Sequence, residues 1–203
     1  MNSEKHMEKN SAVFLDRDGV INNDGGLVWQ IGKLEILPGI AEAVKLLHDN
    51  GWIVVVLTNQ PVVARGWATL AEVENFNKEI DNQLAAARAK IDAWYVCPHH
   101  PRAGLPDYPG LSEYRLDCPD RKPNTGMFKK AAKDFDFDLT KCYAVGDLPV
   151  DIKAGHDAGC KTILVRTGHA GVDPNPKRQF DVKPDFIADD LLAAAKLIIS
   201  KSL

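Results

Sequence analysis

The feature that most constrains the fold of this chain is a repeated alternation between short apolar segments and segments of helical periodicity. The apolar runs predict strands over residues 12–15, 53–57, 91–96, 142–145, 161–165 and 185–188. Apolar residues at helical spacing predict helices over residues 39–50, 70–90, 126–135, 151–158 and 191–199. This alternation predicts an α/β fold in which a doubly wound sheet of mainly parallel strands is the middle of three layers.

The chain length and one long loop indicate the domain organisation. A chain of 203 residues fits one domain with a single core, and no insertion large enough for a cap domain interrupts the pattern. Residues 1–10 are a polar leader, for which we expect disorder. Residues 97–124 contain six prolines, two glycines and little periodicity. Because this loop is longer than ordinary connections, we expect it to be either functional or disordered.

Charge and cysteine content narrow the possible partners and compartment. With 25 basic and 28 acidic residues the formal charge is −3, which gives no broad attraction to nucleic acid or anionic lipid. No apolar run has the length of a membrane span or the form of a signal peptide. Four cysteines are too few for a disulfide scaffold in a chain this long. We expect a cytoplasmic monomer with a small-molecule substrate and no nucleic-acid or membrane partner.

Polar side chains follow three of the predicted strands directly. They are Asp16 with Asp18, Thr58 with Asn59, and Asp147. Any one of these acids could simply cap a helix or a turn. In a parallel sheet, however, the carboxyl ends of the strands lie at one edge, where ligands bind. The combination therefore predicts a ligand site at this edge.

The residue types at this edge suit phosphoryl transfer. Asp16 and Asp18 leave an extended chain on the same side, so that one can attack phosphorus while the other transfers a proton. Carboxylates facing a phosphate dianion require a hard divalent cation, and oxygen ligands suit Mg²⁺. Asp147, with Asp151 as a further candidate, completes the acidic site.

Hydrogen-bond donors and positive charge are also available for the phosphate. Thr58 and Asn59 can donate hydrogen bonds to phosphate oxygens. Arg121 and Lys122 bring two positive charges from the long loop, and Lys122 is the candidate for the compact charge beside the phosphate. Each requirement of phosphoryl transfer thus has a candidate residue.

Four ordered motifs resemble those of the haloacid dehalogenase-like phosphatases. They are Asp16-Arg17-Asp18-Gly19-Val20, Thr58-Asn59-Gln60, Arg121-Lys122-Pro123, and Gly146-Asp147 followed by Asp151. The resemblance implies that Asp16 becomes phosphorylated and that Asp18 protonates the leaving oxygen and later activates water. It also implies that Thr58 and Lys122 bind the transferring phosphate and that Mg²⁺ is held by Asp16, the Asp18 carbonyl and Asp147. Asp151 either belongs to this site or supports it by orienting Lys122 or Asp147.

A narrower resemblance is to the heptose bisphosphate phosphatases within that family. It rests on Thr58-Asn59-Gln60, Ala64-Arg65-Gly66, Cys97-Pro98-His99-His100-Pro101 and Arg121-Lys122-Pro123. It implies removal of the 7-phosphate from a heptose 1,7-bisphosphate, in carbohydrate metabolism that supplies lipopolysaccharide or other cell-surface polysaccharide precursors. Asn59, Arg65 and Arg121 match substrate-contacting positions, although Arg65 could equally be a solvated loop residue. A histidinol-phosphate phosphatase is the nearest rival, and a catalytically silent phosphate- or metal-binding module is the alternative of another class.

The resemblance to the heptose bisphosphate and histidinol phosphatases also implies a structural zinc in the long loop, held by Cys-x-His and Cys-x-Cys. The counterparts in this chain are Cys97, His99, Cys118 and Asp120, so an aspartate stands where the last cysteine is expected. Either Asp120 completes the zinc site or the metal has been lost. With zinc, the loop would hold Arg121 and Lys122 in place without a core of its own.

Overall fold

A single parallel sheet organises the computed structural model, which describes residues 11–175 and 180–201. The strands are β1 (Ala12–Leu15), β2 (Ile53–Asn59), β3 (Ala93–Cys97), β4 (Tyr143–Gly146), β5 (Lys161–Val165) and β6 (Phe186–Ala188). The α-helices are α1 (Ile40–Asp49), α2 (Leu70–Ala86), α3 (Gly126–Phe135), α4 (Pro149–Ala158) and α5 (Leu191–Lys201). The leader 1–10, for which disorder was predicted, lies outside the described residues.

The strand order is β3-β2-β1-β4-β5-β6, and each of these neighbours pairs in parallel. β1 and β4 lie in the middle, where Val13 pairs with Val54 on one side and with Tyr143 on the other. This order confirms the doubly wound α/β fold predicted from the alternation of strands and helices. It also places the chain segments that follow β1, β2 and β4 side by side.

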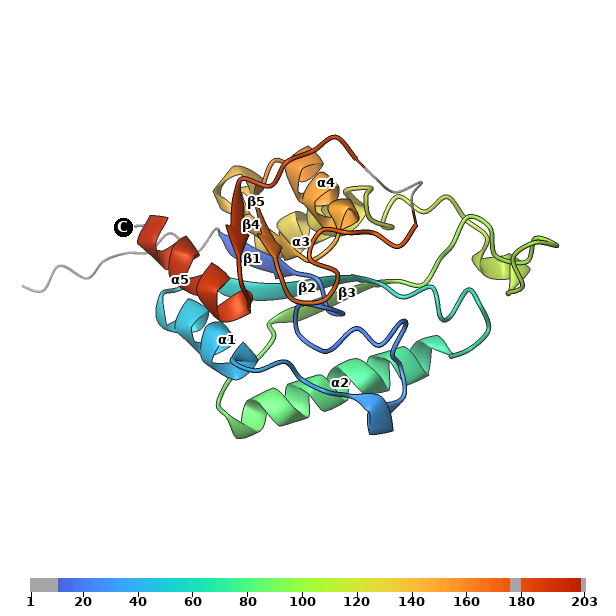
Figure 1. Ribbon diagram of the computed structural model, residues 1–203, viewed down its shortest axis with the longest axis horizontal. Coiled ribbons are helices and arrows are strands. Elements are labelled where there is room, and N and C mark those ends of the chain that lie inside the picture. Colours follow the sequence, from blue (N-terminus) through green and yellow to red (C-terminus); the bar gives the residue numbers. More distant parts are fainter. Residues whose placement is uncertain (1–10, 176–179, 202–203) are drawn as a thin grey trace, which may run out of the picture.

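Helices cover both faces of the sheet, and alternation along each strand decides what each face buries (Figure 1). Val13 and Leu15 of β1 pack into the cluster that includes residues of α1, α2 and α5. Phe14 points to the opposite face, into the cluster with residues of α3 and α4. There its ring makes edge contacts with Phe128 at 5.0 Å and Phe137 at 6.0 Å between centroids.

Most element boundaries differ from the sequence prediction by one to four residues, and two of the differences have a clear local cause. α2 ends at Ala86 rather than near residue 90, because Arg88 adopts a left-handed conformation with φ of 58° that a helix cannot contain. α4 begins at Pro149 rather than Asp151, because proline, with its fixed φ and missing N–H, suits the first turn of a helix. Asp151 therefore lies inside the first turn of α4, at the edge where β4 ends.

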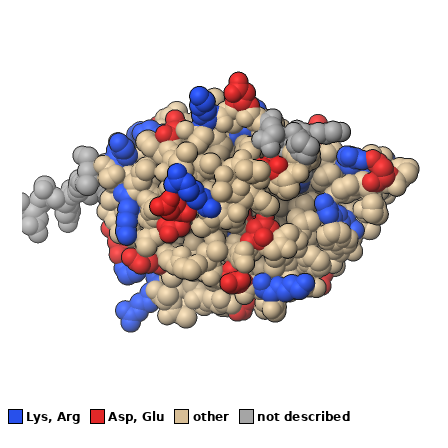
Figure 2. All heavy atoms as spheres, viewed as in Figure 1, with Lys and Arg blue, Asp and Glu red and all other residues tan. Residues whose placement is uncertain are grey.

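The long loop leaves the sheet after β3 and returns at α3, extending well away from the helical layers (Figure 1). It contains a short 3₁₀ helix, Ser112–Tyr114. On the face shown in Figure 2, basic and acidic side chains are interspersed rather than gathered into a field of one sign. Among the described residues, no helix combines the length and apolar character needed to cross a membrane.

Candidate active site

Three carboxylates meet where β1 and β4 end. Asp16 follows β1, and its N–H donates to the Val145 carbonyl at 3.0 Å. Asp147 follows β4 and Asp151 lies in the first turn of α4. One carboxylate oxygen from each of the three lies within 4.8 Å of the others, and all three residues are largely buried. The structure thus brings together acids that the sequence separates by more than a hundred residues.

Lys122 from the long loop enters this group. Its Nζ lies 2.8 Å from Asp16 Oδ1 and 2.7 Å from Asp151 Oδ1, and the residue is 5% exposed. Asp151 Oδ2 also accepts a hydrogen bond from the Leu148 N–H at 3.1 Å. Asp151 therefore both belongs to the acidic group and orients Lys122, so the two roles considered from the sequence are compatible.

The protonation equilibria of this group reflect burial and crowding. Burial raises the pKa of Asp16 to about 7, although Lys122 opposes the shift. Burial, with the charges of Asp151 and Asp16, raises the pKa of Asp147 to about 9. Burial alone would lower the pKa of Lys122, but Asp151 and Asp16 outweigh it and raise that pKa above its usual value. Three acids facing one lysine leave an excess of negative charge that a divalent cation would neutralise.

The surroundings of Asp147 fit a cation ligand. Its Oδ2 accepts a hydrogen bond from the His169 N–H at 2.8 Å, while Oδ1 is buried without a hydrogen-bond partner among the described residues. A Cβ at Gly19 would lie 2.4 Å from Asp147 Oδ2, and one at Gly168 would lie 2.3 Å from it. Only glycine fits so close to this carboxylate, and both glycines have positive φ. A carboxylate oxygen with no hydrogen-bond partner in the described part of the chain, such as Asp147 Oδ1, is a suitable ligand for Mg²⁺.

Asp18 is held by three neighbouring side chains. Arg17 donates from Nε at 3.0 Å to Oδ1 and from Nη2 at 2.9 Å to both carboxylate oxygens. Asn22 Nδ2 donates to Oδ1 at 2.9 Å, and Gln60 Nε2 donates to Oδ2 at 2.7 Å. These hydrogen bonds fix the orientation of the Asp18 carboxylate.

The two polar residues that end β2 have different surroundings. Thr58 is 1% exposed and its hydroxyl accepts a hydrogen bond from Gln60 Nε2 at 2.9 Å. Asn59 exchanges two hydrogen bonds of 3.0 Å with the backbone of Lys122 and also lines the cavity. Asn59 therefore fixes the lysine backbone, which the sequence pattern did not predict.

A cavity of about 420 Å³ opens beside the acidic group. Among the residues that line it are Asp16, Asp18, Asn59, Lys122 and Asp151, together with Arg65, His100, Arg102, Tyr108 and Arg121. Arg65 Nε donates to the Tyr108 hydroxyl at 2.8 Å, and its guanidinium lies 4.7 Å from the Trp67 ring centre. Arg121 donates from Nη1 to the His99 carbonyl at 3.0 Å. Both arginines predicted to contact substrate thus face the cavity in fixed orientations.

Sequence reasoning missed four residues around the site. Arg17 and Gln60 stand inside the quoted motifs, so their adjacency to Asp18 and Asn59 was the available signal. Asp24 and His169 both line the cavity and approach to 3.0 Å, but they come from loops far apart in the chain. No local pattern marks that second pair.

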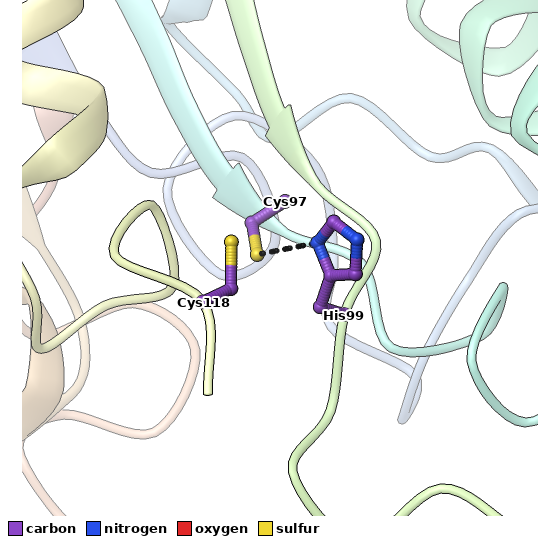
Figure 3. A group of neighbouring side chains, drawn as sticks. All are labelled: Cys97, His99 and Cys118. Atoms are coloured by element: carbon purple, nitrogen blue, oxygen red, sulfur yellow. Dashed lines mark hydrogen bonds between the residues drawn. The ribbon is translucent and has the colours of Figure 1, made fainter. Parts of the chain in front are cut away.

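Three of the four predicted zinc ligands, Cys97, His99 and Cys118, lie together (Figure 3). Cys97, His99 and Cys118 each offer a ligand atom within 4.8 Å of the others, and Cys97 Sγ lies 3.9 Å from His99 Nδ1. Burial raises the pKa of the Cys97 thiol to about 12. Because a metal binds the thiolate, it would have to displace the proton of this thiol. The chemistry of two thiols and an imidazole fits zinc.

The expectation that Asp120 is the fourth ligand is not supported by its placement. Its carboxylate pairs with Lys130 of α3 instead of joining the three soft ligands. The other carboxylate oxygen, Oδ1, packs against Gly126, the first residue of α3: a Cβ at Gly126 would lie only 2.4 Å from it. A carboxylate is favourable at a helix N-terminus, and the lysine one turn further adds attraction. These two interactions account for the different orientation of Asp120.

Comparison with known proteins adds independent information. A family profile described as "HAD-hyrolase-like" matches residues 120–194. The D-glycero-D-manno-heptose-1,7-bisphosphate 7-phosphatase of Thermosynechococcus vestitus is 40% identical over 191 residues, which is 92% of this chain and 94% of the relative. The D-glycero-beta-D-manno-heptose-1,7-bisphosphate 7-phosphatase of Escherichia coli K12 is 37% identical over 179 residues, covering 88% of this chain and 90% of the relative.

A solved structure is similar over nearly the whole chain. The D,D-heptose 1,7-bisphosphate phosphatase of B. bronchiseptica, in complex with magnesium and phosphate, superposes with a TM-score of 0.79 and 31% identity. The match covers 95% of this chain and 99% of that one. The fold described above therefore has a counterpart that was solved in complex with magnesium and phosphate.

Proposed function

Because this chain belongs to the haloacid dehalogenase-like phosphatases, in the branch of the heptose-1,7-bisphosphate 7-phosphatases, we propose that it removes the 7-phosphate from D-glycero-D-manno-heptose 1,7-bisphosphate. As a member of this family it is a phosphoric monoester hydrolase. The observation that carries the proposal is the meeting of Asp16, Asp147 and Lys122 at one edge of the sheet. A histidinol-phosphate phosphatase is not favoured, since the relatives that match are named for heptose bisphosphate.

The first half of the proposed reaction transfers the phosphoryl group to Asp16. Its carboxylate attacks phosphorus while the bond to the sugar oxygen breaks, and Asp18 gives that oxygen a proton. Lys122 is fixed 2.8 Å from Asp16 Oδ1, so its charge lies beside the transferring group. Thr58 contributes a hydroxyl donor for a phosphoryl oxygen.

The second half hydrolyses the aspartyl phosphate. Asp18, now without its proton, takes one from water, and the oxygen of that water attacks phosphorus. The bond to Asp16 breaks and free phosphate leaves. Asp18 thus acts first as acid and then as base, which requires its carboxylate to stay in one place through both steps.

We further propose that Asp16, the carbonyl of Asp18 and Asp147 hold Mg²⁺. When bound, Mg²⁺ neutralises part of the charge of the carboxylates and of the phosphate. The unpaired Oδ1 of Asp147 and the excess of acids over lysine support this assignment. Asp151 has a supporting role, since it holds Lys122 by an ion pair of 2.7 Å.

The second phosphate of the substrate is assigned to the part of the cavity beside Arg65 and Arg121. Both arginines line the same cavity as Asp16, Asp18 and Lys122. Two guanidinium groups fixed by hydrogen bonds suit recognition of a phosphate that does not react. A site without a large cap then selects its substrate chiefly by the two phosphates.

A substrate panel tests this proposal. We expect heptose 1,7-bisphosphate to be hydrolysed with a kcat/KM at least ~100-fold above that of heptose 7-phosphate and histidinol phosphate, because only the bisphosphate engages both arginines. Activity should vanish with chelator and return on addition of Mg²⁺. Faster turnover of histidinol phosphate, or undiminished activity in chelator, would contradict the proposal.

The cluster of Cys97, His99 and Cys118 is proposed to hold a structural zinc. Zinc would anchor the start of the long loop to β3, close to Arg121 and Lys122, which lie only a few residues after Cys118. The burial of both sulfurs and the closeness of the three ligand atoms support this role.

Metal content distinguishes the ligands. We expect the purified protein to contain about one zinc per chain, Cys118→Ser to lose it, and Asp120→Ala to keep it because Asp120 faces Lys130. Cys160→Ser, which removes a buried thiol outside the cluster, is the matched control. Elemental analysis measures zinc directly, and loss of zinc from Asp120→Ala would show that Asp120 rotates into the site.

A further inference from the structure

The side-chain amide of Gln60 connects the two functional residues Asp18 and Thr58. Its Nε2 lies 2.7 Å from Asp18 Oδ2 and 2.9 Å from Thr58 Oγ1. No other described side chain hydrogen-bonds to both of these residues. Gln60 is 0% exposed, so solvent does not compete for these hydrogen bonds.

The orientation of this amide follows from its partners. Asp18 Oδ2 already accepts a hydrogen bond from Arg17 Nη2, so the NH₂ group of Gln60 and not its carbonyl oxygen faces this acceptor. The second N–H of the same group then points to Thr58 Oγ1. Because Thr58 accepts that hydrogen bond, its own proton remains available for a phosphoryl oxygen.

Arg17, which donates to both oxygens of Asp18, is itself fixed by other contacts. Arg17 is also 0% exposed, and it donates to the Val28 carbonyl at 2.7 Å and to Asn77 Oδ1 of α2 at 3.1 Å. Its guanidinium lies 4.6 Å from the centre of the Phe76 ring. Arg17 thus ties Asp18 to the helical layer, while Gln60 ties it to the end of β2.

We propose that Gln60 is a positioning residue that keeps the proton-transferring carboxylate of Asp18 in register with the phosphate-binding hydroxyl of Thr58. The proposal rests on the proposed phosphatase mechanism. The backbone contacts of Gln60 do not depend on its side chain. Its N–H donates to the Cys97 carbonyl at 2.8 Å, and any residue at this position could make that hydrogen bond. Removal of the amide therefore leaves the strand end paired and takes from Asp18 Oδ2 one of its two hydrogen bonds, so that, of the described residues, only Arg17 holds this oxygen.

Two substrates distinguish a loss of Asp18 positioning from a general loss of activity. A sugar phosphate needs Asp18 in both half-reactions, whereas p-nitrophenyl phosphate releases a good leaving group that needs little protonation. In Gln60→Met we expect kcat for the sugar bisphosphate to fall about 10–100-fold with KM changed less than about 3-fold, since general acid–base catalysis contributes ~10²–10⁴-fold in all. With p-nitrophenyl phosphate, the first turnover should stay within about 3-fold of wild type and the following turnovers should be slow.

The first turnover is measured by stopped flow, as one p-nitrophenolate per enzyme, and phosphoenzyme is trapped by acid quench. Gln83→Met makes the same change on the exposed face of α2, where Gln83 contacts only Glu79 among the residues with assigned hydrogen bonds, and should match wild type in both phases. If Gln60→Met does not fold, Gln60→Glu is measured instead. Its carboxylate opposes the charge of Asp18 at similar size and should give the same two phases.

Three outcomes would overturn the proposal: activity of the Gln60 variant within 2-fold of wild type, equal slowing of both phases, or a change confined to KM. Failure of the phosphatase mechanism itself would look different. In that case wild type would form no phosphoenzyme with either substrate, so the two failures are distinguishable.

Discussion

Asp16→Asn is expected to reduce hydrolysis of the sugar bisphosphate at least ~10³-fold while the protein stays folded. The amide has the shape of the carboxylate but is not an effective nucleophile, so the phosphoenzyme cannot form. The measurement is release of inorganic phosphate together with acid-quench trapping of phosphoenzyme. Asp157→Asn is the matched control, because Asp157 pairs with Lys153 on the surface of α4. Turnover of Asp16→Asn above a few per cent of wild type would remove Asp16 from the role of nucleophile.

The same variant should change how the stability of the magnesium-free protein depends on pH. Burial raises the pKa of Asp16 from 3.8 to about 7, so between these values the folded state binds more protons than the unfolded state. Stability of the wild type therefore falls as pH rises through this window, and Asp16→Asn lacks this contribution. The difference in melting temperature, variant minus wild type, should increase between pH 4 and pH 7. A constant difference would mean that Asp16 is not destabilised by burial.

That the acids lie at one edge could be predicted from sequence, because the carboxyl ends of parallel strands share an edge in any doubly wound arrangement. That they lie close together depends on the strand order, which makes β1 a neighbour of both β2 and β4. Lys122 could be proposed from its charge in the long loop, but the contacts that hold it there, reciprocal hydrogen bonds with Asn59 across the irregular loop, could not be predicted. No periodicity encodes that contact.

The different orientation of Asp120 and the omission of Arg17 have one cause: the sequence does not show which way a side chain points. The spacing of Asp120 from Cys118 matched the zinc pattern, but spacing does not show which way a carboxylate turns when Lys130 competes for it. Arg17 was passed over as the residue between two aspartates, although its full burial depends on Asn77 and Phe76 in α2, sixty residues away in the case of Asn77. Such contacts depend on tertiary packing, which a single sequence does not display.

Lys122→Met is expected to affect both catalysis and stability strongly, because this lysine is the cation that lies between Asp16 and Asp151. Methionine retains the length and apolar stem of the side chain but removes its charge. Loss of one fixed donor to a transition-state charge typically costs ~10²–10³-fold in kcat, and we expect a loss at the upper end of that range. Removal of one partner from a buried ion pair should also lower the free energy of unfolding by about 3–5 kcal/mol in the absence of Mg²⁺.

A double variant separates these two effects. Lys122→Met combined with Asp151→Asn removes one of the uncompensated carboxylates, so most of the lost stability should return, while activity should not. Urea unfolding of the metal-free proteins and phosphate release with Mg²⁺ measure the two quantities separately. Lys153→Met breaks an ion pair on the surface of α4, and it should change stability by less than about 1 kcal/mol. If Lys122→Met were no more destabilising than this control, the lysine would not be compensating buried charge. If the double variant regained activity with its stability, the role of Lys122 would be to hold the acidic group together rather than to stabilise the charge of the transferring phosphate.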